Sequence, residues 1–227
     1  MPTLRLLSYN VRSLRDDKAG VARVVSSAEP DVVCIQEAPR FLRWRSKCAA
    51  LARTSGLVVV GGGRRAGANL IMSSLRVDVE SVQSVPFSTD PGLHHRGTAI
   101  AVLRLGSSRF AVAGTHLDVK PEPRLRHVGE LHAALERLVP AGVPAIVAGD
   151  INDKPGSPPW SALSAARADA FAAVGHPFTS TARDPHQTID GVFVDPAITV
   201  RSAHVIDEPD VQVASDHRPL LVELDLP

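Results

Sequence analysis

The chain has 227 residues, of which 44% are apolar and 22% are charged. These fractions are ordinary for a globular protein with a sizeable core, and they exclude a chain dominated by disorder. The formal net charge is only +1. No strong overall positive field therefore attracts a polyanion, and charge alone does not favour a nucleic-acid ligand.

The first half of the chain is predicted to contain mostly strands. Residues 4–10 alternate and then turn polar, which predicts a strand, and residues 19–28 have the spacing of a helix. Residues 31–37 hold a short apolar run that stops at Gln36 and Glu37, which is typical of a buried strand. Residues 41–52 repeat apolar side chains at helical spacing. Further strands are predicted at residues 57–60, 68–73, 77–85, 98–105 and 110–116.

The glycine-rich residues 61–67 resemble a phosphate-binding loop only superficially. They lack the Gly-Lys-Ser/Thr ending and the following helix of such loops. We therefore expect a flexible hairpin or loop at this place.

The second half of the chain mixes one long helix with short strands. Residues 125–138 carry leucine and valine on one helical face, and residues 144–149 form a buried strand that ends at Asp150. Short strands follow near residues 191–194, 199–206 and 220–224. Because several strands follow one another without a helix, we expect largely antiparallel pairing in two packed sheets with helices outside. No linker divides the chain, so residues 1–227 are expected to form one α/β (α+β) domain.

Cysteine content and hydropathy set the expected compartment. Cys34 and Cys48 are too few for a disulfide framework and do not form a C-x-x-C motif, so we expect two reduced, largely buried thiols. No apolar run approaches the ~20 residues that span a bilayer, and the N-terminus lacks the apolar core of a secretory signal. A cytoplasmic protein without a transmembrane segment or an obligate protein partner is expected.

Polar residues repeatedly stand directly beside apolar, strand-like runs. They are Asn10, Glu37, His116, Asp118, Asp150, Asn152, Asp190, Asp216 and His217. Because strand ends on one edge of a sheet sandwich converge, these side chains are candidates for one shared site. Oxygen ligands such as Glu37, Asp150 and Asp216 favour Mg²⁺ or Mn²⁺ over zinc.

Six short segments, in this order, closely resemble the signatures of the endonuclease/exonuclease/phosphatase superfamily. They are Ser8-Tyr9-Asn10-Val11, Ile35-Gln36-Glu37, Gly114-Thr115-His116-Leu117-Asp118, Gly149-Asp150-Ile151-Asn152, Ile189-Asp190-Gly191-Val192-Phe193 and Ser215-Asp216-His217-Arg218-Pro219. The resemblance covers almost the whole chain. It implies a four-layer sandwich of two central sheets flanked by helices, similar to DNase I, with the active site at one edge.

The resemblance also implies roles for the oxygen-bearing side chains. Glu37 is expected as the principal metal ligand, with Asn10 nearby as a second ligand or an orienter. Asp216 is expected to complete the metal or water network. Asp150 should position or deprotonate the attacking water, while Asn152 holds the phosphate and the nucleophile.

Two histidines complete the implied site. His217, hydrogen-bonded by Asp190, is expected to stabilise the charged phosphorus centre or to transfer a proton. His116 is expected to donate to a phosphate oxygen. An aspartate beside a histidine favours the imidazolium form, which suits a phosphate-facing group.

Two arginines qualify the resemblance. Arg12 stands where many relatives have an acidic residue. We therefore expect either that Arg12 contacts phosphate or that Asp16 or Asp17 is the metal ligand instead. Arg96, in a His-His-Arg-Gly segment before a strand, is either a phosphate or structural contact or an ordinary loop charge. The chain also lacks the long basic and aromatic insertions of nuclease relatives and is only 4% aromatic.

The sequence therefore predicts a Mg²⁺- or Mn²⁺-dependent phosphoesterase that hydrolyses a phosphodiester by water attack. Nucleic acid or a nucleotide is the leading substrate class, and a phospholipid headgroup or a small phosphorylated metabolite stays open. The alternative is a catalytically silent binding module on the same fold. The complete set of acidic and imidazole residues argues against that alternative.

Overall fold

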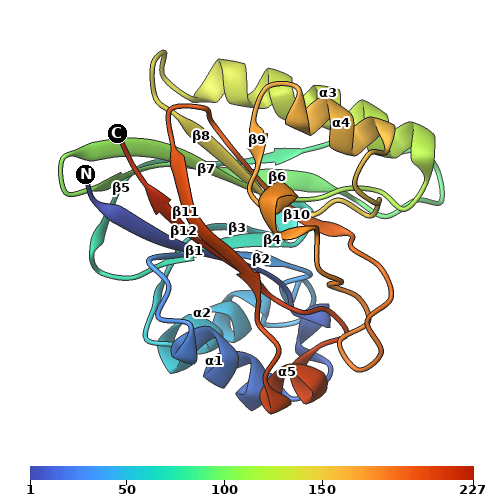
Figure 1. Ribbon diagram of the computed structural model, residues 1–227. Helices are drawn as coiled ribbons and strands as arrows, with labels where there is room; N and C mark the ends of the chain where they lie inside the picture. Colours follow the sequence, from blue (N-terminus) through green and yellow to red (C-terminus); the bar gives the residue numbers. More distant parts are fainter.

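Two six-stranded sheets pack face to face, and helices cover both outer faces (Figure 1). The structure is a computed structural model that describes all 227 residues. The helices α1, α2 and α5 cover one sheet, while α3 and α4 cover the other (Figure 1). This arrangement confirms the predicted four-layer sandwich.

The strand order of the first sheet is β11-β12-β1-β2-β4-β3, and that of the second is β5-β6-β7-β8-β10-β9. The first sheet contains β1 (Thr3–Asn10), β2 (Val32–Gln36), β3 (Val58–Gly63), β4 (Asn69–Ser73), β11 (Thr199–Val205) and β12 (Leu220–Asp225). The second contains β5 (Val77–Pro86), β6 (Gly97–Leu105), β7 (Ser108–His116), β8 (Ala145–Asp150), β9 (Ala168–Asp169) and β10 (Asp190–Val194).

The helices are α1 (Lys18–Ser27), α2 (Trp44–Thr54), α3 (Pro121–Leu138), α4 (Pro158–Ser164) and α5 (Pro209–Ala214). Short 3₁₀ turns are η1 (Arg12–Leu14), η2 (Arg64–Ala66) and η3 (Ala172–Val174).

Strand pairing is antiparallel except at two places. The pairs β1–β2 and β7–β8 are parallel, so the two sheets are mixed but largely antiparallel, as predicted. The parallel pairs place the last residues of neighbouring strands at the same edge. Asn10 lies opposite Gln36 in the first sheet, and His116 lies opposite Asp150 in the second.

Apolar side chains fill the three spaces between the four layers. The largest cluster lies between the sheets and includes Leu6, Ile71 and Phe110. A second cluster packs α1, α2 and α5 onto the first sheet, and a third packs α3 and α4 onto the second. Because burial of a large apolar side chain contributes about 1.5–3 kcal/mol, packing on both faces holds the sheet edges that carry the site.

The predicted helix at residues 41–52 begins later than expected, at Trp44. Arg43, the residue before it, has left-handed backbone angles (φ 58°), and Phe41 is exposed rather than packed on the helix face. Apolar spacing alone suggested that Phe41 belonged to the helix. The left-handed turn at Arg43 sets the start instead, because such a residue cannot continue a right-handed helix.

The glycine-rich segment is also more regular than predicted. Gly61, Gly62 and Gly63 continue β3 and pair with β4, and η2 follows directly. Gly62 has φ +100°, and a Cβ atom there would lie 2.2 Å from the carbonyl oxygen of Asn69. Close backbone approach, rather than flexibility, explains glycine at this position.

Two short helices, α4 and α5, are absent from the sequence-based prediction. Both have proline in the first turn, where a missing N–H has no cost. At seven and six residues they are too short for apolar periodicity to reveal them. The dipeptides Ser157-Pro158 and Glu208-Pro209 were the available signal.

Two expectations from composition can be compared with the structure. Cys34 and Cys48 are free and buried, and burial raises their thiol pKa values to about 12 and about 11. No helix combines the length and the apolarity that a bilayer span requires.

Candidate active site

Strand ends from both sheets bring the predicted polar residues to one edge. Asn10 ends β1, His116 ends β7, Asp150 ends β8 and Asp190 begins β10. Asp190 is the direct cross-strand neighbour of Asp150. The chain termini lie at the opposite end of the sandwich, where β1 begins and β12 ends (Figure 1).

Asp150 is the centre of the hydrogen-bonding network. Its Oδ2 accepts from Asn10 Nδ2 at 3.0 Å and lies 3.2 Å from His116 Nε2. The same oxygen lies 3.8 Å from His217 Nε2. Asp150 is only 2% exposed. The two sheets therefore meet at this carboxylate, because Asn10 belongs to the first and His116 to the second.

The turn after β8 fixes the other oxygen of Asp150. The backbone N–H of Asn152 donates to Asp150 Oδ1 at 3.0 Å, and the Asn152 amide donates to the Leu117 carbonyl at 3.0 Å. Asn152 has φ 56°, a conformation that asparagine tolerates better than most residues. This turn ties the ends of β7 and β8 together.

His217 and Asp190 form a buried pair. His217 Nδ1 lies 2.9 Å from Asp190 Oδ2. Two hydroxyls that the sequence did not point out support the pair. Thr179 Oγ1 accepts from the Asp190 N–H at 3.4 Å, and Ser215 Oγ accepts from the His217 N–H at 3.4 Å. Ser215 Oγ also donates to the Asn10 carbonyl at 2.7 Å. Both residues are buried.

The carboxylates around His217 favour its imidazolium form. Burial alone would lower the pKa of His217, but Asp190, and then Asp150 and Asp216, raise it to about 10. At neutral pH His217 is therefore a cation inside a ring of carboxylates. The protonated His217 stabilises the folded state to its full extent below a pH of about 6.5, the pKa of a histidine in the unfolded chain. This stabilisation is lost as the pH rises toward about 10, the pKa of His217 in the folded protein.

We expect Asp190→Asn to lower the pKa of His217 by about 1–3 pH units, because a neutral amide no longer attracts the imidazolium. An NMR titration of the metal-free protein measures this directly. The stability of the wild-type protein should also decrease with rising pH between about 6.5 and 10 more steeply than that of the variant. Equal histidine pKa values in both proteins would contradict the pairing.

His116 has the opposite tendency. Burial lowers its pKa to about 3, although the charge of Asp150 acts against this effect. Arg96 and His217 lower it further. His116 is thus a neutral imidazole. Its Nε2 lies 3.2 Å from Asp150 Oδ2, and its Nδ1 has no hydrogen-bond partner.

Glu37 follows the end of β2 at the same edge. Its φ is 51°, and its half-buried carboxylate makes no hydrogen bond or ion pair within the chain. Arg96 lies in the field of Asp150, Asp118 and Glu37, in decreasing order of strength. Burial nevertheless lowers the pKa of this guanidinium, and its Nε has no partner. Asp118 itself accepts from the Lys120 N–H at 2.8 Å, which makes it a turn cap.

Arg12 and Asp216 lie beside this network and face each other. Arg12 Nε is 3.3 Å from Asp216 Oδ2, and Arg12 Nη1 is 3.3 Å from Asp16. Asp17 accepts from Ala19 N–H as the N-cap of α1 and pairs with Arg23. Asp17 is thus engaged in helix capping and in an ion pair, and a metal-binding role for Asp16 or Asp17 stays a prediction.

Asp150, Asp190 and His217 place potential metal-ligating atoms within 4.8 Å of one another. Their hydrogen bonds argue for proton chemistry rather than for a resident ion at these three atoms. A metal-bound histidine must lose its proton, and the neighbouring carboxylates raise the pKa of His217. Glu37 is different, because its oxygens have no competing partner in the chain.

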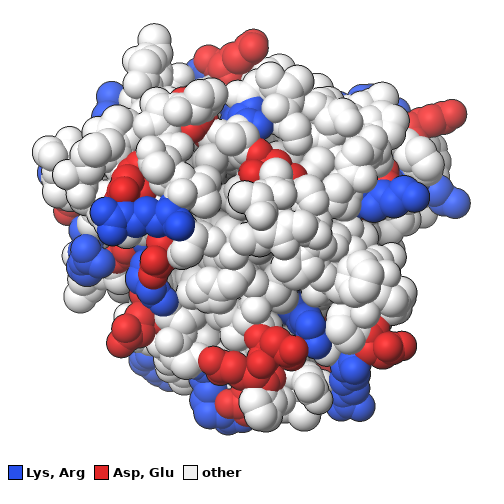
Figure 2. Space-filling view, in the orientation of Figure 1, with Lys and Arg blue, Asp and Glu red and all other residues white.

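The surface charge agrees with the small net charge of the chain. Lysine and arginine alternate with aspartate and glutamate on the face shown, and no large patch of one sign covers it (Figure 2). On this face, therefore, no extended patch of one sign is present to attract a charged substrate (Figure 2).

Comparison with known proteins agrees with this architecture. The sequence profile of the Endonuclease/Exonuclease/phosphatase family matches residues 7–217. An endonuclease/exonuclease/phosphatase from Bacteroides vulgatus is similar over 100% of both chains, with 20% identity and a TM-score of 0.83. A mannosyl-6-phosphatase from Bacteroides thetaiotaomicron has 18% identity and a TM-score of 0.83, over 98% of this chain and 100% of that one.

A third similar structure is TDP2 of D. rerio complexed with single strand DNA product. It has 18% identity and a TM-score of 0.75, over 99% of this chain and 100% of that one. The curated protein sequences gave no match. The fold, the six ordered motifs and the family match over 7–217 together show that this chain belongs to the endonuclease/exonuclease/phosphatase family.

Proposed function

We propose that this protein is a Mg²⁺- or Mn²⁺-dependent phosphoesterase that hydrolyses a phosphodiester by attack of water. Nucleic acid or a nucleotide is the leading substrate class. The similar structures include both a mannosyl-6-phosphatase and a TDP2 bound to DNA product. A phosphorylated metabolite and a phospholipid headgroup therefore stay in the substrate test.

The arrangement around Asp150 carries this proposal. Its Oδ2 accepts from Asn10 at 3.0 Å, and its Oδ1 accepts from the Asn152 N–H at 3.0 Å. A buried carboxylate fixed in this way can take a proton from water with little reorganisation. Asn10 acts here as an orienter, since its Oδ1 also accepts from the Arg12 N–H at 3.0 Å.

The two histidines divide the remaining work. His217, kept protonated by Asp190, supplies positive charge to the phosphorus centre as negative charge develops, or gives its proton to the leaving oxygen. Neutral His116 donates a hydrogen bond to a phosphate oxygen. The opposite pKa tendencies of the two imidazoles suit these different roles, since one carries a positive charge and the other is neutral.

Glu37 is the residue that suits a hard divalent cation. It is a carboxylate without a partner at the edge where Asp150 and Arg96 also lie, and oxygen ligands are the ones that Mg²⁺ and Mn²⁺ prefer. We place Asp216 in the surrounding water network. A bound cation would neutralise phosphate charge and lower the pKa of a coordinated water.

We expect hydrolysis of bis-p-nitrophenyl phosphate to require Mg²⁺ or Mn²⁺ and to stop in EDTA. In Glu37→Gln, which keeps the size but removes the charge, the metal concentration for half-maximal activity should rise by about tenfold or more. Release of p-nitrophenolate measures both effects. Asp78→Asn is a suitable control, because Asp78 is exposed on β5 and pairs only with Arg104.

The alternative, a silent binding module, predicts a different result. In that case isothermal calorimetry would detect a bound cation while no phosphate ester is turned over. Plasmid DNA, single-stranded RNA, sphingomyelin and a panel of sugar phosphates, assayed side by side, then identify the substrate class. Metal-independent hydrolysis would contradict the proposed mechanism.

A further inference from the structure

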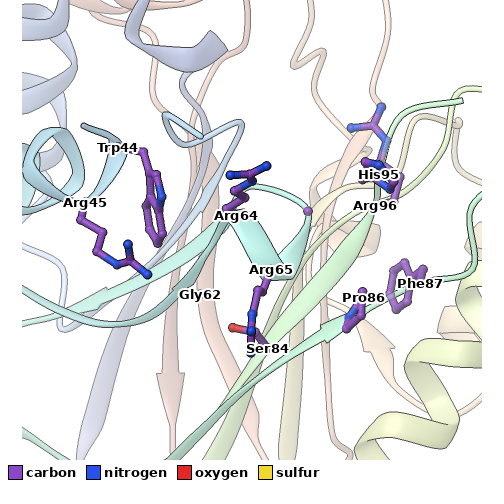
Figure 3. A pocket seen from close by; sticks show the side chains of 11 residues that line it. Trp44, Arg45, Gly62, Arg64, Arg65, Ser84, Pro86, Phe87, His95 and Arg96 are labelled. Carbon is purple, nitrogen blue, oxygen red and sulfur yellow. The ribbon is translucent and has the colours of Figure 1, made fainter. Parts of the chain in front are cut away.

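A cavity of about 880 Å³ borders the candidate active site. It lies between the first turn of α2, the turn η2, the end of β5 and the segment before β6 (Figure 3). Its charged and aromatic walls include Trp44, Arg45, Arg64, Arg65, His95 and Arg96. The proposed hydrolysis does not use this space.

The lining of this cavity is positively charged without compensation. It contains four arginines and no aspartate or glutamate. None of the four makes an ion pair, whereas Arg76, Arg104 and Arg109 each pair with a carboxylate elsewhere in the chain. In a chain with a net charge of +1, this concentration of unpaired guanidinium groups favours an anionic ligand.

Arg96 connects the cavity to the active site. It is only 9% exposed, its Nε has no hydrogen-bond partner, and it also lies in the field of Asp150 and Glu37. Its neighbour Gly97 is opposite His116 in the register of β6 and β7. A buried donor without a partner at this junction indicates a polar ligand group that completes its hydrogen bonds.

The start of α2 adds a second source of positive potential. Trp44 and Arg45 are the first two residues of this helix, whose first turn has no acidic residue and no side-chain cap. The free N–H groups and the helix dipole favour an anion there.

The Trp44 ring is also held in place beside the cavity. The Arg45 guanidinium lies 4.5 Å from the centre of the ring, and Gly63 leaves room for it, since a Cβ there would be 2.4 Å from Trp44. In Figure 3, Trp44 and Arg45 lie on one side of the view and His95 and Arg96 on the other, with Arg64 and Arg65 between them.

We propose that this arginine cavity binds a second phosphate group of the substrate while the first phosphate is hydrolysed beside it. The inference rests on the proposed function for the position of the first phosphate. The second phosphate comes either from the next link of a nucleic-acid strand or from a small bisphosphorylated metabolite. Arg64 and Arg65 are the binding residues at the open side, and Arg96 is the link to the reaction centre.

A matched pair of substrates tests the proposal. Both are thymidine 5′-phosphate p-nitrophenyl esters, and only one carries an additional 3′-phosphate. We expect the wild-type enzyme to prefer the bisphosphorylated ester, and Arg64→Ala/Arg65→Ala to lower the ratio of the two kcat/KM values by about tenfold. Arg53→Ala/Arg137→Ala removes the same charge from exposed positions outside the cavity and should preserve the ratio.

A binding measurement separates this inference from the proposed hydrolysis. Calorimetry with inorganic pyrophosphate in EDTA should show affinity that weakens by about tenfold in Arg64→Ala/Arg65→Ala, but not in the control pair. If the double variant does not fold, Arg45→Ala on α2 replaces it. Should the wild-type protein hydrolyse no ester yet bind pyrophosphate through these arginines, only the proposed function fails.

Other outcomes decide the inference itself. An unchanged substrate ratio together with unchanged pyrophosphate affinity would overturn it. Competition against the bisphosphorylated ester by a short single-stranded oligonucleotide or by a sugar bisphosphate then distinguishes the two sources. With the oligonucleotide, the dependence of log affinity on log salt should decrease by about one for each arginine removed.

Discussion

Asp150→Asn is expected to reduce kcat/KM for bis-p-nitrophenyl phosphate by about 10²–10⁴-fold. The substitution keeps the size of the side chain. It removes the carboxylate that we propose accepts a proton from the attacking water. It also places an amide against donors, because Asn10 Nδ2 lies 3.0 Å from one oxygen and the Asn152 N–H lies 3.0 Å from the other. Steady-state release of p-nitrophenolate at saturating metal measures the loss.

Two controls keep this expectation specific. Asp78→Asn removes an exposed carboxylate at the far end of β5, where Asp78 pairs with Arg104 in register, and should change the rate by less than about twofold. Circular dichroism establishes that Asp150→Asn is folded. A folded Asp150→Asn variant with wild-type activity would exclude Asp150 as the base.

Gly149→Ala is expected to destabilise the protein by about 3 kcal/mol or more. A Cβ atom at this position would lie 1.9 Å from the carbonyl oxygen of Thr115 and 2.8 Å from its carbonyl carbon. Both are backbone atoms of the neighbouring strand β7, so no side chain can rotate away. The strands β7 and β8 would have to separate where they carry His116 and Asp150. Chemical denaturation measures the free energy of unfolding.

Gly114→Ala is the matched control on the adjacent strand. A Cβ atom there would make ordinary contacts, at 3.5 Å from Cys34 and 3.8 Å from Ile71, so we expect a change below about 1.5 kcal/mol. If both variants lose the same stability, close backbone approach is not the reason for glycine at position 149. Activity should fall together with stability in Gly149→Ala but not in Gly114→Ala, because Asp150 directly follows Gly149.

The parts of the fold that the sequence predicted share one physical basis. Long apolar runs such as those in β2 and β8 are buried on both faces, and their polar ends mark the sheet edge. Periodicity also located α1 and α3. The start of α2 was misplaced, because a left-handed residue at Arg43 (φ 58°) leaves no trace in hydropathy. The short helices α4 and α5 contain too few turns to show a period.

The candidate site was predictable as a set of residues but not as a network. Ordered motifs named Asp150, Asp190 and His217 without indicating which groups touch. Only the structure shows that Asn10 and His116, from different sheets, meet at the same oxygen of Asp150. The supporting hydroxyls of Thr179 and Ser215 lie in loops and carried no pattern that set them apart from other turn residues.

The arginine cavity is the feature that the sequence patterns were least able to predict. Arg45, Arg64 and Arg96 are separated along the chain, and the segment around Arg64 was expected to be a flexible loop. Regular pairing of Gly61–Gly63 with β4 instead fixes this segment beside α2 and β6. The net charge of the whole chain also did not indicate the cavity, because acidic residues elsewhere cancel the charge of its arginines.

The sequence by itself determined the layers, the strand ends and the chemical identity of the acidic and imidazole groups. These depend on local apolar runs and on the residues that directly follow them. The tertiary structure alone decided which carboxylate meets which imidazole, that Asp17 caps α1, and where unpaired arginines collect. Those outcomes depend on packing between segments more than a hundred residues apart, such as Asn10 and Asp150, and local patterns do not encode such contacts.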